Sequence, residues 1–541
     1  MIQGETLSDI ADAIRTRTGM SASMTPSQMV SAIAAIPSGS GADANELLYS
    51  LMNRTLVSVY DLSGAVSTIN QYVFMSQSML NTVYCPSASG VELSAFADCI
   101  ALTTVDLPNA SFISNCAFQG CGVLETVNAS NATSIGSSAF ANCSSLESAI
   151  FPNVTNILNS TFYSCTSLKT VNMSSVLSVG QLAFYKCTVL ESIDFPLATI
   201  LSTSAFQACS SLSAVNVPNV STIGIYGFGG CVKLENINLP SVTTIYASAF
   251  YGCVSLASIS LPILNTMGSG TFRGCAALKG IELSLITNMP ASAFDGCVKL
   301  SSANIPNAQS IGAGAFSECT TLEAISFPNV KSIGSSAFIK CSGLISAYIP
   351  MATSVPTCAF QSCISLENIN AENATTINTL AFYGCISLKS IDFSKCTTIA
   401  ERAFMNCTAL ESANLPLVAS VYSSAFSGCS SLKNISIPSA RLIGYRAFDG
   451  CTTLTKIEAP MLSSISQNAF NNCYNLISLY LTNSMVCTLA QSGAFNSTPI
   501  GGYSGSTSSA PAIYVPASLY QTYISSTNWS LFSSIFVSVS A

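Results

Sequence analysis

The segment SIGSSAF occupies Ser134–Phe140 and occurs again, letter for letter, at Ser332–Phe338. The two copies start 198 residues apart, which is nine times 22. Steps of 22 residues in both directions from Phe140 reach a phenylalanine every time from Phe74 to Phe470, which makes nineteen copies in register. A fixed period of this length indicates a solenoid, in which each coil stacks on its neighbours to bury a shared core.

Other positions of the unit repeat with the phenylalanine. A cysteine stands three residues later from Cys99 to Cys473, a leucine six residues later from Leu80 to Leu476, and a proline twelve residues later in thirteen copies. The unit reads A-F-x-x-C-x-x-L-x-x-[IV]-x-[LIF]-P-x-[AV]-x-x-[IV]-x-x-x. It therefore combines a short alternating apolar stretch with a return segment that contains the phenylalanine.

The stretch L-x-x-[IV]-x-[LIF] predicts a short strand with its apolar residues pointing inward, such as Leu102, Val105 and Leu107. The proline that follows cannot donate a hydrogen bond to a β-ladder, so it ends the strand. Stacked copies predict a long parallel sheet along one face, with the phenylalanine column between the sheet and the return segments. The return segment is too short for more than a turn or two of helix.

This consensus resembles the BspA-like branch of the leucine-rich repeats, whose units run L-x-x-I-x-[IL]-P followed by I-G-x-x-A-F-x-x-C. The similarity covers roughly residues 56–500. It implies an α/β-type leucine-rich repeat solenoid of about 19 coils of 22 residues, with a parallel β-sheet on one face. It also implies adhesion or protein recognition through the exposed sheet, and it brings no catalytic residues.

The ends of the chain depart from the repeat. Apolar stripes near the N-terminus predict two short helices, which bury too little surface to be stable alone. The last segment carries aromatic residues that we expect to cover the final coil, because a solenoid needs caps to stay soluble. The predicted parts are a helical attachment module (1–37), a flexible linker (38–44), an N-terminal capping coil (45–73), the repeat array (74–482) and a C-terminal cap (483–541).

The N-terminal segment ETLSDIADAIRTRTGMSASMTPSQMVSAIAAI resembles a module at the front of structural proteins from bacteriophage tails. That resemblance implies that residues 1–37 attach the chain to other virion tail proteins. The start of the chain, MIQGETLSDIADAIRTRTG, lacks a basic region followed by an apolar core, so we expect no secretory signal peptide.

The composition excludes several classes of protein. Charged residues make up 8% of the chain, against about 25% in a typical soluble protein. A net charge of −7, with 18 basic residues spread along the chain, argues against binding to nucleic acid. No apolar run approaches the ~18 residues that a membrane span needs, so we expect no membrane insertion. The absence of histidine removes Ser-His, Cys-His and His-metal sites.

Eighteen of the 23 cysteines occupy the repeat position. Equivalent residues on successive coils should lie about 4.8 Å apart, but parallel side chains have poor geometry for a disulfide. The pattern predicts a column of buried thiols that act as small apolar fillers, with metal or redox use as the alternative. We expect no cofactor and no metal, because calcium binding has no loop signature here.

The exposed strand position ten residues after each phenylalanine holds Asn, Asp or Glu in twelve of nineteen copies. Such a face suits sugar hydroxyls or a polar protein surface. Stacked asparagines can equally hydrogen-bond along a sheet without any ligand. We predict ligand binding at Tyr348, Asn370, Asp392 and Asn414, where an aromatic residue adjoins three polar positions.

These features predict a non-enzymatic, bacteriophage tail-associated structural protein. It would be made in the host cytoplasm, join the virion tail and bind a host-surface glycan or protein through the array. The alternative is a bacterial cell-surface adhesin or protein-recognition repeat protein. A glycan-cleaving tail enzyme would need a pocket that interrupts the repeat and carboxyls in unlike environments. Homo-oligomer formation stays open.

Overall fold

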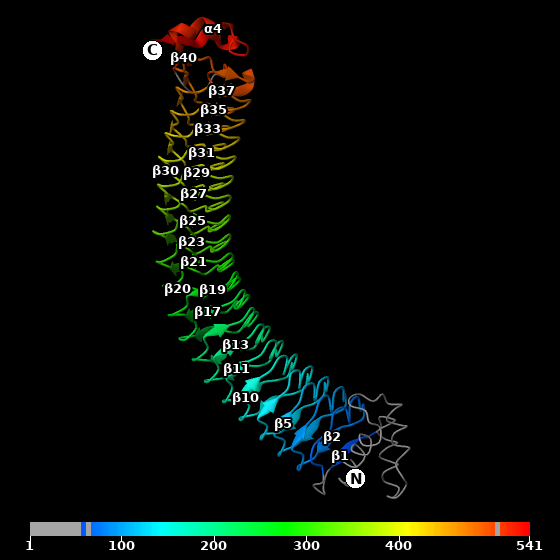
Figure 1. The fold of residues 1–541 in the computed structure, drawn as a ribbon. Helices are drawn as coiled ribbons and strands as arrows, with labels where there is room; N and C mark the ends of the chain where they lie inside the picture. The colour runs from blue at the N-terminus through cyan, green and yellow to red at the C-terminus, as the bar shows by residue number, and fades with distance from the viewer. Residues whose placement is uncertain (1–55, 61–65, 504–508, 541) are drawn as a thin grey trace, which may run out of the picture. The chain divides into compact units, whose positions relative to one another are not determined.

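A computed structural model of the chain describes residues 56–60, 66–503 and 509–540. The chain divides into two compact units, one ending at Thr266 and the other beginning at Met267. Each unit is a stack of regular coils with a three-residue strand, a two-residue strand and tight turns (Figure 1). The predicted solenoid is confirmed. The predicted helical module at 1–37 and linker at 38–44 lie outside the described residues.

The first unit contains two series of strands. The three-residue strands are β1 (Ser58–Tyr60), β2 (Thr82–Tyr84), β4 (Thr104–Asp106), β6 (Thr126–Asn128), β8 (Ser148–Ile150), β10 (Thr170–Asn172), β12 (Ser192–Asp194), β14 (Ala214–Asn216), β16 (Asn236–Asn238) and β18 (Ser258–Ser260). The two-residue strands are β3 (Gly90–Val91), β5 (Phe112–Ile113), β7 (Ser134–Ile135), β9 (Asn156–Ile157), β11 (Ser178–Val179), β13 (Ile200–Leu201), β15 (Thr222–Ile223) and β17 (Thr244–Ile245). The short strand β19 (Thr266–Met267) contains the last residue of this unit and the first of the next.

The second unit continues both series. Its three-residue strands are β20 (Gly280–Glu282), β22 (Ser302–Asn304), β24 (Ala324–Ser326), β26 (Ser346–Tyr348), β28 (Asn368–Asn370), β30 (Ser390–Asp392), β32 (Ser412–Asn414), β34 (Asn434–Ser436), β36 (Lys456–Glu458) and β38 (Ser478–Tyr480). Its two-residue strands are β21 (Asn288–Met289), β23 (Ser310–Ile311), β25 (Ser332–Ile333), β27 (Ser354–Val355), β29 (Thr376–Ile377), β31 (Thr398–Ile399), β33 (Ser420–Val421), β35 (Leu442–Ile443), β37 (Ser464–Ile465) and β39 (Thr488–Leu489).

Strands pair in parallel with their equivalents one coil away, as Val83 does with Val105 and Val105 with Val127. The three-residue strands form successive parallel sheets of two to four strands, which confirms the parallel sheet predicted for these strands. The two-residue strands form the longer ladders, such as the seven-stranded one from β27 to β39. Sequence periodicity missed this second ladder, because nearly all of its strands carry a single fully buried position, such as Ile113 or Ile135.

The core of each unit is a column of buried phenylalanines. Successive rings stack with their centroids 5.2 Å apart for Phe96 and Phe118, and 5.3 Å apart for Phe118 and Phe140. This offset stacking lies within the range that aromatic pairs prefer. The leucine six residues after each phenylalanine is buried beside it. The repeat period therefore follows from the need to place identical rings above one another.

The cysteine column does more than fill space. The Cys121 thiol donates a hydrogen bond to the carbonyl oxygen of Phe96, one coil earlier, at 3.1 Å. The same oxygen accepts a bond from the backbone N–H of Cys99 at 3.2 Å. Both lone pairs of a buried carbonyl are thus satisfied, which avoids a desolvation cost of about 1–3 kcal/mol. In the described residues no disulfide links the cysteines, in line with the predicted column of buried thiols.

Each return segment turns twice through the left-handed region. The residues two before and two after every phenylalanine from Phe74 to Phe470 have φ between +51° and +76°. Glycine supplies some of these positions, including Gly230, but most are other residues, including Ala208 with φ of +62°. The N–H of Ala208 donates to the carbonyl of Gly229 at 2.7 Å, so these turns also bond one coil to the next. The return segments of the described coils therefore form tight turns, where the sequence allowed at most a turn or two of helix.

The C-terminal end of the array is covered by a compact cap. Phe495 continues the phenylalanine column, with its ring 5.5 Å from that of Phe470. The Trp529 indole N–H donates to the carbonyl of Cys487 at 2.6 Å, and the Tyr523 hydroxyl accepts from the Cys487 N–H at 2.8 Å. The cap comprises η1 (Ser492–Phe495), β40 (Ala512–Pro516), η2 (Ala517–Leu519), α4 (Tyr520–Ser525), η3 (Ser530–Ile535) and β41 (Phe536–Val539). The aromatic cover predicted for the last segment is therefore confirmed.

We expect Ala208→Gly to raise the stability of the protein by up to about 1 kcal/mol, because glycine removes the strain of a left-handed alanine. The matched variant Ala205→Gly should lower it by about 1 kcal/mol or more, because Ala205 is buried and lies outside the left-handed region. Urea unfolding monitored by circular dichroism measures both changes. Equal destabilisation by the two variants would show that the left-handed turns carry no strain.

The thiol column predicts a loss of stability at alkaline pH. Burial raises the pKa of Cys253 and of Cys297 to about 12, from an ordinary value near 9. Between these two values the unfolded chain releases protons that the folded chain retains, so stability falls as pH rises above about 9. Each such thiol should contribute about 1.4 kcal/mol per pH unit within this window.

Urea unfolding midpoints at pH 8, 9, 10 and 11 test this expectation. The variant Cys253→Ser is the control, since a serine hydroxyl can still donate to the carbonyl of Phe228 but does not titrate in this range. Its stability should fall with pH by about one proton less than that of the parent protein. An identical pH dependence in both proteins would contradict the assignment of this effect to the thiol column.

Candidate ligand-binding face

The three-residue strands of each unit present a face to solvent. Their first and third residues are exposed or half-exposed, as in Asn368–Asn370, whereas the equivalents of Leu102 and Leu107 on either side are buried. We call this set of first and third residues the outward face. Its side chains stand on a rigid ladder, so the sequence of each strand decides the chemistry of the face without altering the core.

The four predicted ligand-binding residues all lie on the outward face of the second unit. Tyr348 is 46% exposed and is the register partner of Asn370. Asp392 and Asn414 are register partners in the next sheet, and the Asn414 amide donates to the Asp392 carboxylate at 2.9 Å. The structure thus brings the residues together in two pairs. Their role in ligand binding stays a prediction.

The Asp–Asn hydrogen bond recurs along the outward face. Asn128 donates to Asp106 at 2.7 Å, and Asn216 donates to Asp194 at 2.7 Å. In each case the carboxylate precedes the amide by one coil. These bonds support the structural alternative for the polar ladder, in which neighbouring side chains stabilise the sheet without a ligand.

Ion pairs also lie beside the outward face, at the position one residue before some of the three-residue strands. Lys389 lies 2.6 Å from Glu367, and Lys433 lies 3.0 Å from Glu411. All four side chains are at least 40% exposed, so each pair contributes little to stability. Their main effect is to neutralise charge along the edge of the face.

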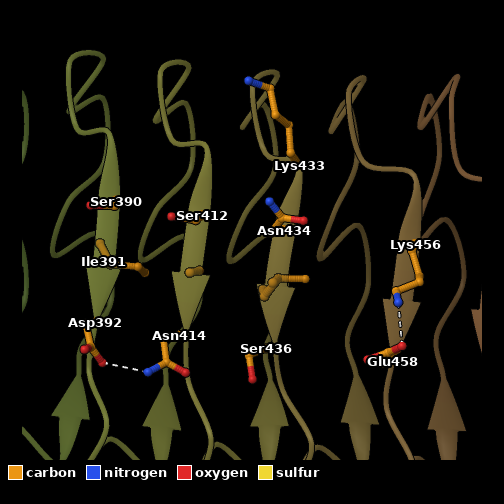
Figure 2. A pocket seen from close by; sticks show the side chains of 12 residues that line it. Ser390, Ile391, Asp392, Ser412, Asn414, Lys433, Asn434, Ser436, Lys456 and Glu458 are labelled. Carbon is orange, nitrogen blue, oxygen red and sulfur yellow. Dashed lines mark hydrogen bonds and ion pairs between the residues drawn. The ribbon is translucent and has the colours of Figure 1, made fainter.

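The second unit also contains a trough, which opens on the outward face across β30, β32, β34 and β36. We define the trough by its polar side chains Asp392, Asn414, Asn434, Ser436, Lys456 and Glu458, and its volume is about 530 Å³. Figure 2 shows the Asp392–Asn414 pair at one side, the Lys456–Glu458 pair at the other, and Ser436 between them. Sequence analysis identified one side of this site, Asp392 and Asn414, but not the other four residues.

Short side chains between longer ones create the trough. Asn434 and Ser436 of β34 separate Asn414 from the ion pair of Lys456 with Glu458, which lie 2.6 Å apart. In the described structure the Asn434 and Ser436 side chains have no hydrogen-bond partner in the protein. Beyond Lys456, the rings of Tyr480 and Tyr514 stack at 4.2 Å, and the Lys456 ammonium lies 5.5 Å from the Tyr480 ring centre. The sequence signals this site at the position ten residues after the phenylalanine, which changes from Ser436 to Glu458 to Tyr480 in successive coils.

Two further kinds of site were sought in the described residues. Among them, no group of three or more cysteine or acidic side chains is placed to hold a metal ion. None of the helices in the described part of the chain has the length and apolarity to cross a bilayer. What the outward face can do is donate and accept hydrogen bonds from fixed positions.

A double-mutant cycle tests whether the Asp392–Asn414 bond stabilises the sheet. We expect Asp392→Ala and Asn414→Ala to be coupled by about 0.5–1 kcal/mol, because each removes the same hydrogen bond. Tyr348→Ala and Asn370→Ala are the matched control, since these register partners share no side-chain hydrogen bond. Urea midpoints of the single and double variants give the coupling. A coupling near zero at both pairs would rule out the structural role of the Asp–Asn bond.

Comparison with solved structures gives several bacterial leucine-rich repeat proteins. One from Bacteroides ovatus is 27% identical, with a TM-score of 0.43, and the match covers 70% of this chain and 82% of that one. A leucine-rich cell surface protein from Faecalibacterium prausnitzii is also 27% identical, with a TM-score of 0.34, over 61% of this chain and 83% of that one. One from Eubacterium ventriosum is 18% identical, with a TM-score of 0.28, over 65% and 83%. The comparison with curated proteins gave no match.

Comparison with family models is decisive. The model for the BspA-type leucine-rich repeat region matches in six copies, with overlapping matches from residue 45 to residue 506. These matches cover most of the chain and coincide with the coils described above. The chain therefore belongs to the BspA-type leucine-rich repeat family.

Proposed function

We propose that the protein is a non-enzymatic recognition protein that binds a partner through its outward face. The observation that carries this proposal is the division of labour within each coil. The inward positions repeat the same residues, such as the phenylalanine from Phe74 to Phe470, whereas the outward position changes among Asn, Asp, Glu, Ser, Tyr and Ile. A constant scaffold with a variable exposed face suits recognition of a specific surface.

The proposed setting is a bacterial cell surface, where the protein would act as an adhesin or protein-recognition module. Membership of the BspA-type leucine-rich repeat family supports this setting. A second candidate is a bacteriophage tail protein, favoured by the resemblance of residues 1–37 to a module of tail structural proteins. Both candidates bind a partner through the outward face. They differ in whether the protein is held on a bacterial envelope or on a phage tail, so one binding experiment tests the shared part of both.

The arrangement of the carboxylates supports a non-enzymatic role. Asp392 and Glu458 are exposed, and each is engaged by a neighbouring side chain, Asn414 or Lys456. Acid–base catalysis of glycoside cleavage needs two carboxyls in unlike environments. The outward face gives its carboxylates similar environments, at the surface of a regular ladder.

Binding of the labelled full-length protein to a panel of bacterial and animal epithelial cells tests the proposal. The variant Ser326→Arg with Asn370→Arg places two cations beside Tyr348 on the outward face, so we expect cell binding to fall about tenfold or more. The control variant Asn288→Arg with Ser332→Arg places the same charges on exposed residues of two-residue strands and should bind as the parent does.

Equal binding by both variants, or binding to none of the cells, would overturn recognition through the outward face. Immunogold electron microscopy of the producing culture, with antibody against the repeat array, separates the two settings in the same experiment. Gold on bacterial envelopes supports the surface adhesin, and gold on phage tails supports the virion protein.

A further inference from the structure

We propose that the trough on the second unit is a binding site for a neutral glycan. This inference rests on the proposed function, because it names the class of ligand that one part of the outward face takes. The volume of the trough, about 530 Å³, lies within the ~300–1,000 Å³ typical of small-molecule sites. The trough opens to solvent along the face, so a sugar at the end of a longer chain can enter it.

The trough offers the mixture of groups that sugar hydroxyls require. A hydroxyl donates one hydrogen bond and accepts others, so its site must supply both acceptors and donors. The acceptors are the carboxylates of Asp392 and Glu458 and the amide oxygen of Asn414. The donors are the amide of Asn434, the Ser436 hydroxyl and the Lys456 ammonium, which keeps spare N–H groups after pairing with Glu458.

The charges of the trough favour a ligand without net charge. Lys456 pairs with Glu458 at 2.6 Å, and Lys433 at the edge pairs with Glu411 at 3.0 Å. Asp392 accepts a hydrogen bond from the neutral Asn414 amide. A phosphate or uronate would be repelled by the carboxylates of Asp392 and Glu458. A cation would be repelled by the ammonium groups of Lys433 and Lys456. A neutral hydroxyl group meets neither penalty.

The trough also has an apolar component. Ile435, the central residue of β34, is half-exposed in its lining, whereas Ile391 and Ala413 of the neighbouring strands are buried beneath it. Sugars present C–H groups as well as hydroxyls, so a site that combines both kinds of surface fits them better than it fits a phosphate or an ammonium.

The position along the ladder distinguishes this site from the other Asp–Asn pairs. After Asp106 and Asn128 the next outward residue is Ile150, and after Asp194 and Asn216 it is Asn238. After Asp392 and Asn414 it is Ser436, followed by the charged Glu458. A small residue between two larger pairs leaves room for a ligand.

The test uses saturation-transfer NMR and titration calorimetry on the full-length protein. The probes are methyl glycosides of common hexoses and N-acetylhexosamines, their β-linked disaccharides, inorganic phosphate and a lysine-rich peptide. We expect at least one neutral sugar to bind saturably, in the ~millimolar range that a single shallow site gives. The variant Ser436→Tyr fills the trough and should weaken that binding about tenfold or more.

The matched control is Ser260→Tyr, which adds the same ring at the equivalent outward position of β18 and should leave sugar binding unchanged. Absence of sugar binding, or equal binding by Ser436→Tyr, overturns the proposal. Binding of phosphate or peptide that Ser436→Tyr abolishes, without any sugar binding, overturns it in favour of another ligand class. If the protein binds cells through its outward face but no sugar enters the trough, this inference fails while the proposed function stands.

Discussion

The phenylalanine column sets the geometry of every coil within each unit. Identical rings such as Phe96 and Phe118 stack only if the chain returns to the same place after each coil, and a fixed length of 22 residues achieves that. The carbonyl of each such phenylalanine then faces the interior and must find two donors. A backbone N–H of its own coil and a thiol of the next coil supply them. Cysteine recurs because it is small, largely apolar and still a donor.

The backbone of the return segment follows from the same constraint. Bringing the phenylalanine inward while the chain reverses requires two left-handed residues, one on each side of it. Their N–H groups then point along the stack and bond to the next coil, as that of Ala208 does to Gly229. Every side of the coil is therefore bonded to its neighbours. The outward side chains take no part in the phenylalanine column or in the turns, so their chemistry can change from coil to coil.

Much of this architecture could be predicted from the spacing of Phe, Cys and Leu, because those residues occupy the core and a core position tolerates few residue types. The second ladder could not be predicted in this way. A two-residue strand such as Phe112–Ile113 has one buried residue, so it shows no alternation of apolar and polar positions. The left-handed turns were hidden for a related reason. Serine, lysine and leucine occupy them as well as glycine, so no residue type marks them. The trough depends on the heights of adjacent side chains, and a consensus sequence averages these away.

Recognition by such a face depends on where its ladder is interrupted. The Asn414 amide and the Asp392 carboxylate already satisfy one another, so a ligand that binds them must compete with an existing hydrogen bond. Asn434 and Ser436 have no such partner among the described residues, and a ligand that reaches them replaces only water. Where outward side chains bond to one another in this way, few of their donors and acceptors are available to a ligand. Binding free energy becomes available where a short side chain leaves neighbouring donors and acceptors unpaired, and on the second unit that place is β34.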